Sequence, residues 1–343
     1  MDKYTKHIVS RKGGREENQD SFGECETKHG HLFVVCDGMG GMKGGKTASQ
    51  LAVSVILEEA SISPLTDPGE ILAVAIRRAN SAVYQTSRTH EDLQGMGTTV
   101  VALLIDDEKA TAAHVGDSRI YQVRGGRKVF RTFDHSMVFE LVKRGRITEE
   151  QARLSAESNV ISRAVGTKPD VQVEISPVLP YQKGDRFLLC SDGICGAVPE
   201  KELLRLVTCN KSVEKTAESV AETIDKAGFD NGGGHDNLTL ALIETIIYSK
   251  IKPLMDRRSK TIIGILSLII LVLAGFGIWA VFTCLKPYRE NREAVKELPA
   301  IILQQQNTVN SLVANPAGNG VPALKDSVER QWVKINSLVN SIK

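Results

Sequence analysis

The 343-residue sequence lacks the features that mark several common protein classes. Its six cysteines are few and irregularly spaced, which excludes a disulfide framework, and Cys36 and Cys190 end apolar runs as reduced core thiols do. A formal net charge of +2 gives no reason to expect a nucleic-acid partner. The first residues contain no apolar secretory run, so we expect the N-terminal region to stay in the cytoplasm.

One segment departs from this ordinary composition, because residues 261–285 carry no charge and are largely apolar. As a helix this segment is about 37 Å long, which is enough to cross a hydrocarbon core of about 30 Å. Trp279 and Phe282 lie near one end, where interfacial aromatic residues are typical. We therefore predict a single-pass protein of the cell membrane. The Lys and Arg residues on the two sides nearly balance, so the orientation rests on the missing export signal.

This span divides the chain into four parts. Residues 1–247 form a soluble domain, 248–260 a basic linker, 261–285 the transmembrane helix, and 286–343 a polar tail on the far side of the membrane. Apolar residues in the tail are compatible with two amphipathic helices or with a weakly ordered stalk, and the sequence leaves both open.

The soluble domain has the pattern of an α+β fold. Apolar and β-branched runs predict strands at 31–37, 171–178, 186–192 and 238–247, with several more between 98 and 132. A 3.6-residue periodicity predicts helices at 46–60, 69–87, 200–207 and 213–227. Because short turns join consecutive strands and the helices come in pairs, we expect antiparallel sheets layered with helices.

Aspartates at the ends of apolar strands carry the chemistry. Asp37 and Asp192 each end a strand, Asp117 follows another, Asp236 precedes one, and Asp20 stands in the motif ENQDSFG. Each aspartate alone could be a turn or cap residue. Together, with few histidine or cysteine ligands between them, they favour a hard divalent cation such as Mg²⁺ or Mn²⁺ over zinc. If they meet in space, their mutual repulsion needs such cations.

A competing motif lies at residues 40–47, which match the phosphate-binding pattern G-x-x-x-x-G-K-[ST] and stand between a predicted strand and a predicted helix. This alternative makes the protein a P-loop nucleotide hydrolase. It is less favoured because Asp37 and Gly38 directly precede the loop. The later strands also have hairpin connections, whereas a P-loop enzyme needs a parallel sheet.

Eight segments together resemble the bacterial type of metal-dependent (type 2C, PPM family) serine/threonine protein phosphatases. In chain order they are GREENQDSFG, VVCDGMGG, GMGTTVVALLI, AHVGDSRIYQVRGG, DHSMVFELVKRGRIT, ISRAVG, GDRFLLCSDGI and GHDNLTLALI. They span residues 14–243, so the resemblance covers nearly the whole soluble domain. It implies a four-layer α-β-β-α sandwich, with two mainly antiparallel sheets flanked by helix pairs and the metal site at one end.

The resemblance also implies roles for individual residues. Arg15 matches the arginine that grips phosphate, and Asp37 matches the carboxylate that bridges two metals. The remaining matches are metal ligands, with two or three Mn²⁺ or Mg²⁺ ions expected, and they are Asp20, the carbonyl of Gly38, Asp117, Asp192 and Asp236. Met39 stands where the eukaryotic branch has a histidine proposed as general acid. Gln19 replaces a glutamate of that branch, and the turn at residues 157–159 lacks the His-Pro common in the flap of bacterial relatives.

The implied reaction is hydrolysis of phosphoserine and phosphothreonine in proteins by a hydroxide that bridges two metals. No covalent intermediate is required, and no arginine stands six residues after any cysteine, which disfavours a thiol-based phosphatase. The expected partners are phosphoprotein substrates of a Ser/Thr kinase and the lipid bilayer. A non-catalytic membrane-anchored phosphoprotein-binding or sensor module is the remaining alternative.

Overall fold

The computed structural model describes residues 3–209 and 211–247, with a few isolated positions between 300 and 337. The chain divides into two units, Met1–Pro253 and Leu254–Lys343, and every helix and strand named below belongs to the first. The predicted linker 248–260 and transmembrane helix 261–285 lie outside the described residues, as does the tail apart from those isolated positions. None of the helices in the described part of the chain is long and apolar enough to cross a bilayer.

Two five-stranded antiparallel sheets form the centre of the first unit. The first sheet has the order β1 (Tyr4–Arg11), β12 (Leu238–Thr245), β11 (Arg186–Cys190), β8 (Arg119–Arg124) and β9 (Arg127–Arg131). The second has the order β10 (Glu174–Ile175), β7 (Ala110–Val115), β6 (Val100–Ile105), β3 (Gly30–Cys36) and β2 (Ser21–Thr27). A short pair, β4 (Gly38–Met39) and β5 (Gly97–Thr98), completes the strands described.

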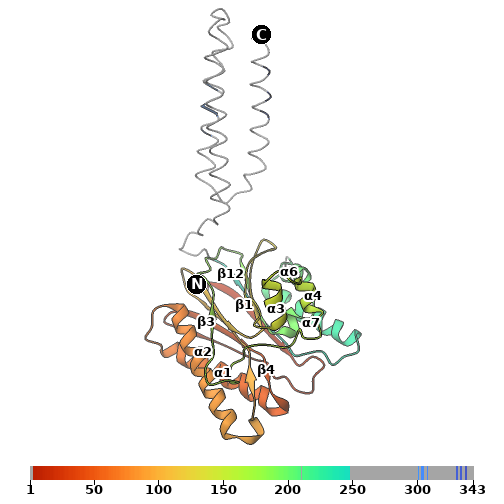
Figure 1. Cartoon of the computed structure of the whole chain (residues 1–343). Helices are drawn as coiled ribbons and strands as arrows, with labels where there is room; N and C mark the ends of the chain where they lie inside the picture. Colours follow the sequence, from red (N-terminus) through yellow and green to blue (C-terminus); the bar gives the residue numbers. More distant parts are fainter. Residues whose placement is uncertain are drawn as a thin grey trace, which may run out of the picture. The chain divides into compact units, whose positions relative to one another are not determined.

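Helix pairs cover the outer faces of the two sheets (Figure 1). The second sheet carries α1 (Gly41–Ile62) and α2 (Pro68–Thr89), and the first carries α6 (Glu200–Val207) and α7 (Val213–Asp230). The shorter helices are η1 (Glu91–Leu93), α3 (Met137–Lys143), α4 (Glu149–Arg153) and α5 (Asp192–Cys195). The layers therefore run helix, sheet, sheet, helix.

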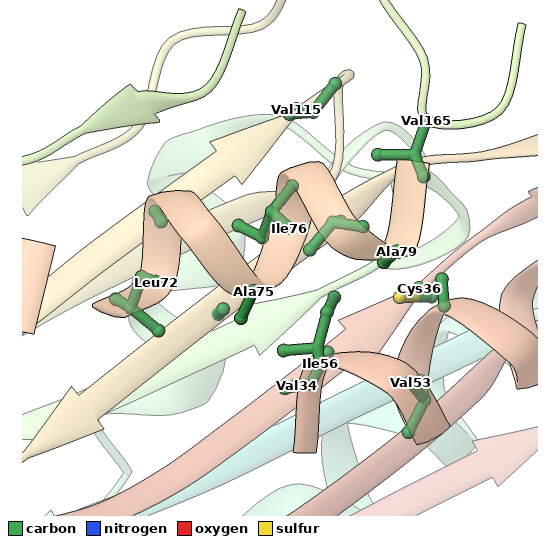
Figure 2. Packing of buried hydrophobic residues seen from close by; sticks show 14 of the residues in the cluster. Val34, Cys36, Val53, Ile56, Leu72, Ala75, Ile76, Ala79, Val115 and Val165 are labelled. Carbon is green, nitrogen blue, oxygen red and sulfur yellow. The ribbon is translucent and has the colours of Figure 1, made fainter. Parts of the chain in front are cut away.

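The apolar residues of β3 show how one strand supplies two cores. Leu32 and Val34 belong to the core shared with α1 and α2. Figure 2 shows Val34 close to Ile56 of α1 in this core. Phe33 and Val35 point the other way, into the core between the sheets. This alternation follows from the period of two residues in a strand, and it explains why the whole run is apolar.

The α+β class with two antiparallel sheets and helices is confirmed, and Cys36 and Cys190 are buried free thiols as predicted. The strand predicted at 171–178 is confirmed in part, because a strand is present there but only Glu174–Ile175 forms a ladder with β7. Beyond it the Ser176 hydroxyl, rather than a backbone carbonyl, accepts the Ala112 N–H. Pro177 then has no N–H with which to continue the ladder.

Candidate metal and phosphate site

The topology brings the five predicted aspartates to one end of the sandwich. Because neighbouring strands run antiparallel, the last residue of one strand lies beside the first residue of the next, as Cys36 lies opposite Ser21. Asp37 therefore comes near Asp20. By the same rule Asp192, after β11, comes near Asp236, which stands just before β12.

A cavity of about 760 Å³ opens at this end. Asp37, Asp117, Asp192 and Asp236 all line it, and Arg15 stands at the same cavity. Gly38 lines it too. Residues from five separate parts of the chain thus share one space, as a site for cations held by several carboxylates requires.

Asp20 lies behind this cavity and is only 2% exposed. Its Oδ2 accepts a hydrogen bond of 2.9 Å from the Ser191 hydroxyl. The Lys46 ammonium binds the backbone carbonyl of Asp20 at 2.8 Å. Asp20 is therefore fixed next to Asp192 through Ser191, and its carboxylate keeps one oxygen for another partner.

The pKa values of these carboxyls are shifted upward. Burial raises the pKa of Asp37 well above its usual range, and the charges of Asp192 and Asp20 raise it further. Burial and the charge of Asp192 do the same for Asp117. Burial, followed by the neighbouring carboxylate of Asp236, raises the pKa of Asp192, and burial raises that of Asp20 to about 6. Burial and mutual repulsion therefore disfavour the charged forms of these carboxyls, and a bound cation would relieve both.

Two oxygens in this group are buried with no hydrogen-bond partner among the described residues, namely Oδ1 of Asp20 and Oδ1 of Asp192. An unpartnered buried carboxylate oxygen is costly, and a hard divalent cation is the partner that an all-oxygen cluster fits best. The residues present therefore suit Mn²⁺ or Mg²⁺. Among the residues described, neither a thiol nor an imidazole lines this cavity, so the donor set seen there is not one that zinc prefers.

Backbone contacts hold Asp37 and Gly38 in place. Thr98 and Thr99 both bind the Asp37 backbone: the Thr98 hydroxyl and the Thr99 N–H each donate to its carbonyl at 2.8 Å. A Cβ on Gly38 would lie 2.1 Å from the Gly45 carbonyl, so the close approach of this strand end to α1 requires glycine.

Arg15 is half exposed at the cavity rim, where a guanidinium NH2 group donates to Oδ2 of Asp236 at 2.9 Å. Asn237 fixes the loop that carries Arg15. Its amide nitrogen donates to the carbonyls of Lys12 and Glu17 at 2.8 and 3.0 Å. Asp236 occupies one guanidinium donor, and an arginine has five, so Arg15 keeps donors for a further oxygen ligand at this cavity.

Sequence reasoning assigned no role to Asn237, Thr98, Thr99 or Ser191. The signal was available, because all four stand in the segments that carry the family resemblance. They act through hydrogen bonds to atoms that are distant in sequence, to the backbone for Asn237 and Thr98 and to the Asp20 carboxylate for Ser191. Residue type alone does not show which of these atoms a residue will meet.

The model of the family described as "Protein phosphatase 2C" matches residues 9–231 of this chain. The chain belongs to the protein phosphatase 2C family. The Listeria monocytogenes protein named serine/threonine phosphatase stp is 34% identical over 241 residues, covering 69% of this chain and 93% of its own length. The shared family makes the present chain a serine/threonine protein phosphatase.

Solved structures agree with this family. The serine/threonine phosphatase Stp1 from Staphylococcus aureus superposes with a TM-score of 0.64 at 29% identity, covering 70% of this chain and 94% of that one. The catalytic domain of the phosphatase PstP, solved with two manganese ions, gives a TM-score of 0.58 at 31% identity, covering 71% and 98% of the two chains.

The P-loop alternative fails in the phosphatase. Both main sheets are antiparallel, and Lys46, the lysine of the motif, is engaged with the Asp20 carbonyl. A Cβ on Gly45 would lie 2.5 Å from the Gln19 side chain and 2.8 Å from the Gly38 carbonyl. Gly45 thus lets the start of α1 pack closely against the acid-bearing loops.

His114 and His135, which could have served in proton transfer, lie outside the cavity. Their rings stack at 4.5 Å, and their ligand atoms come within 4.8 Å of each other and of Glu174. Nδ1 of His135 accepts the Gly116 N–H at 3.1 Å, so Nε2 carries the proton that faces Glu174. Burial lowers the pKa of His135 to about 4. The neutral ring has no lone pair left for a metal and supports the Gly116 turn.

A second cavity of about 460 Å³ adjoins the first, and Arg15 and Asp192 line both. Its other walls come from α3, α4, α5 and α7. The segment between Asp134 and the turn at residues 157–159 corresponds to the flap of bacterial relatives. It contains two short helices, α3 and α4, which were not predicted. The buried ion pair of Arg119 with Asp134 at 2.6 Å fixes the base of this segment.

Proposed function

We propose that the chain hydrolyses phosphoserine and phosphothreonine in proteins, in a metal-dependent reaction at the cytoplasmic face of a membrane. One observation carries the chemistry: Asp37, Asp117 and Asp192 share a cavity with Arg15, and burial together with the charges of neighbouring carboxylates raises their pKa values. That combination suits a site that binds cations and then a phosphoryl group.

Six positions would hold two or three Mn²⁺ or Mg²⁺ ions, and they are Asp20, Asp37, the Gly38 carbonyl, Asp117, Asp192 and Asp236. The manganese ions of the PstP structure support the choice of metal. When bound, such cations supply a nucleophilic water at neutral pH and neutralise charge on phosphoryl oxygens.

The protein itself contributes orientation and charge. Arg15 offers a planar guanidinium to the phosphoryl oxygens, and the carboxylate of Asp236 holds it at the cavity rim. Met39 lines the cavity and has no proton to give, so this position supplies no general acid to the leaving group. Both phosphoserine and phosphothreonine are the products of protein kinases, so a Ser/Thr kinase is the class of enzyme that makes the substrate.

The reaction is tested with the full chain in detergent. We expect turnover of p-nitrophenyl phosphate and of a phosphothreonine peptide that requires Mn²⁺ or Mg²⁺, stops with a chelator and returns when the metal is added back. A phosphotyrosine peptide is the matched control substrate. A metal-loaded, folded protein that hydrolyses neither p-nitrophenyl phosphate nor the phosphothreonine peptide would refute the proposal and favour a non-catalytic binding module.

We also propose that residues 261–285 anchor the enzyme, with residues 1–247 on the cytoplasmic side and 286–343 on the other. The uncharged, apolar composition of this segment supports it. The expected result is that the full chain sediments with membranes and stays there in high salt, whereas the same chain with two arginines placed near position 273 is released. Protease added to intact cells should remove the tail alone, and cleavage of residues 1–247 would show the opposite orientation.

A further inference from the structure

The loop that carries Arg15 and the loop that carries Asp236 are joined through their backbones. The Gly14 N–H donates to the His235 carbonyl at 3.0 Å. Gly13, at φ 60°, comes so close that an added Cβ would lie 2.1 Å from the Asp236 carbonyl. A shift of the His235 backbone must therefore move both loops.

The His235 side chain is anchored on the opposite side, on α7. Its Nε2 donates to Oδ1 of Asp225 at 2.8 Å, since a carboxylate can only accept. The His235 and Phe229 rings pack in a T-shaped arrangement, with their centroids 4.8 Å apart and an angle of 86° between their planes. Gly228 provides the space, because a Cβ there would lie 2.3 Å from the His235 ring.

The remaining ring nitrogen, Nδ1, is buried without a partner among the described residues. One hydrogen bond and the packing against α7 thus fix the ring. Asp225, the only hydrogen-bond partner described for the ring, is itself set by Arg11 of β1, whose NH1 group lies 3.6 Å from Oδ2. The ring orientation therefore depends on contacts that single substitutions can remove.

We propose that His235 is a positioning residue of the phosphatase site: its ring, held by Asp225 and seated over Gly228, fixes at once the loop of Arg15 and the carboxylate of Asp236. This inference rests on the proposed function. It adds α7 to the site, since the helix sets the distance between the phosphate-binding guanidinium and the cation-binding carboxylate. Neither Asp225 nor Gly228 lines the larger cavity.

The test uses full-length protein in detergent and four variants. His235→Ala removes the ring, His235→Gln keeps an amide donor near the position of Nε2, and Gly228→Ala displaces the ring without removing it. Alanine favours a helix more than glycine does, so Gly228→Ala does not weaken α7 by itself. Lys226→Ala is the matched control, because Lys226 is exposed on the same helix.

Three quantities are measured: the calorimetric affinity for Mn²⁺, amide hydrogen exchange across residues 12–16, and kcat and KM for p-nitrophenyl phosphate. We expect His235→Ala and Gly228→Ala to weaken Mn²⁺ binding and raise KM by about tenfold, the scale of a group that supports a ligand. Exchange in the Arg15 loop should accelerate, while the thermal midpoint stays near that of the wild type. His235→Gln should recover most of each loss, and Lys226→Ala should match the wild type.

Wild-type Mn²⁺ affinity, exchange and KM in both His235→Ala and Gly228→Ala would overturn the proposal. If His235→Ala does not fold, Gly228→Ala decides alone by the same criteria. A wild-type protein with no turnover would refute the phosphatase proposal, yet Mn²⁺ affinity and hydrogen exchange would still decide whether His235 positions the two loops.

Discussion

Strand β11 has a carboxyl group just beyond each of its ends, and the two groups have opposite surroundings. Asp185, directly before the strand, is fully buried and accepts two hydrogen bonds from the Arg124 guanidinium, at 2.7 and 2.6 Å, and one from Gln122 at 2.9 Å. Asp192, directly after the strand, has one buried oxygen with no partner among the described residues, and its pKa is raised.

The difference shows how one sheet can hold a compensated acid at one end of a strand and an uncompensated acid at the other. A buried carboxylate is tolerated when an arginine and further hydrogen bonds compensate its lost hydration, as at Asp185. At the other end of β11 the fold places more acids, Asp37 and Asp236, where a compensating cation would be expected. That cation must come from outside the chain, which is why the contrast points to a metal site.

The largest effect is expected from Asp192→Asn. Removing a carboxylate from the cavity should lower kcat for p-nitrophenyl phosphate by about a thousandfold or more, beyond the ten- to hundredfold loss typical of residues that only support a ligand. The metal-free variant should be no less stable than the wild type, because a repulsive charge is gone. A variant that keeps a tenth of wild-type turnover would show that Asp192 is structural, like Asp185.

Asp185→Asn should give the reverse pattern. It leaves the partly exposed Arg124 guanidinium without its counter-charge and an uncharged amide in the buried position, so the loss of unfolding free energy should be at most about 3–5 kcal/mol, the cost of breaking a fully buried pair. Urea denaturation measures this loss, and kcat per folded molecule should stay within about twofold of the wild type, since Asp185 does not line the cavity. A large loss of kcat at unchanged stability would erase the contrast between the two ends of the strand.

In the absence of metal, the stability of the protein should depend on pH through the buried aspartates of the cavity end. The pKa of Asp20 rises from 3.8 to about 6 on folding, so the folded state binds its proton more tightly. This tighter proton binding stabilises the folded state fully below pH 3.8. The stabilisation disappears as the pH rises through 6, which lowers the unfolding free energy by about 3 kcal/mol. Metal-free Asp20→Asn should therefore be more stable than the wild type at pH 7 and equal to it near pH 4.

Thermal unfolding with and without Mn²⁺ checks this prediction. Saturating Mn²⁺ should stabilise the wild type at pH 7 by about 2.7 kcal/mol when the ion is present at a hundred times its dissociation constant. Asp185→Asn should gain as much from the ion as the wild type does. If metal-free wild type became steadily more stable between pH 4 and pH 7 relative to Asp20→Asn, the sign of the Asp20 shift would be wrong.

The smallest effect should come from Arg15→Lys, which keeps the positive charge but loses the two-pronged guanidinium. We expect KM for p-nitrophenyl phosphate to rise about tenfold, within the range for hydrogen bonds to charged groups, with little change in stability because Arg15 is half exposed. Arg205→Lys, at an exposed ion pair on α6, is the matched control. Equal KM values for the two variants would remove Arg15 from phosphate binding.

The sequence predicted the parts of this molecule that rest on local pattern. The apolar runs located β3, β11 and β12, and because each has an aspartate within two residues of one end, they also located the acids. The paired helices were found by their periodicity. The start of α1 was placed five residues late, since Gly41, Gly44 and Gly45 give no helical signal although tertiary packing makes them helical.

Elements that depend on tertiary partners were missed. Strand β1 lies at a sheet edge and is largely polar, so it lacks the apolar signal that identified its neighbour β12. Helices α3 and α4 are short and take their position from pairs such as Arg131 with Glu149. His235 and Asp225 stand ten residues apart in sequence, and only the packing of α7 reveals that they form a unit.

The pairing of β1 with β12 has a consequence for the topology of the catalytic unit. Tyr4 lies opposite Thr245, whereas Arg11 and Leu238, at the other end of the ladder, lie beside the loops of the site. The two ends of the catalytic unit therefore meet at the end of the β1–β12 ladder opposite the site. A short linker between them, with new termini opened at the exposed β8–β9 turn around Gly125, should yield a circular permutant that still binds its metals.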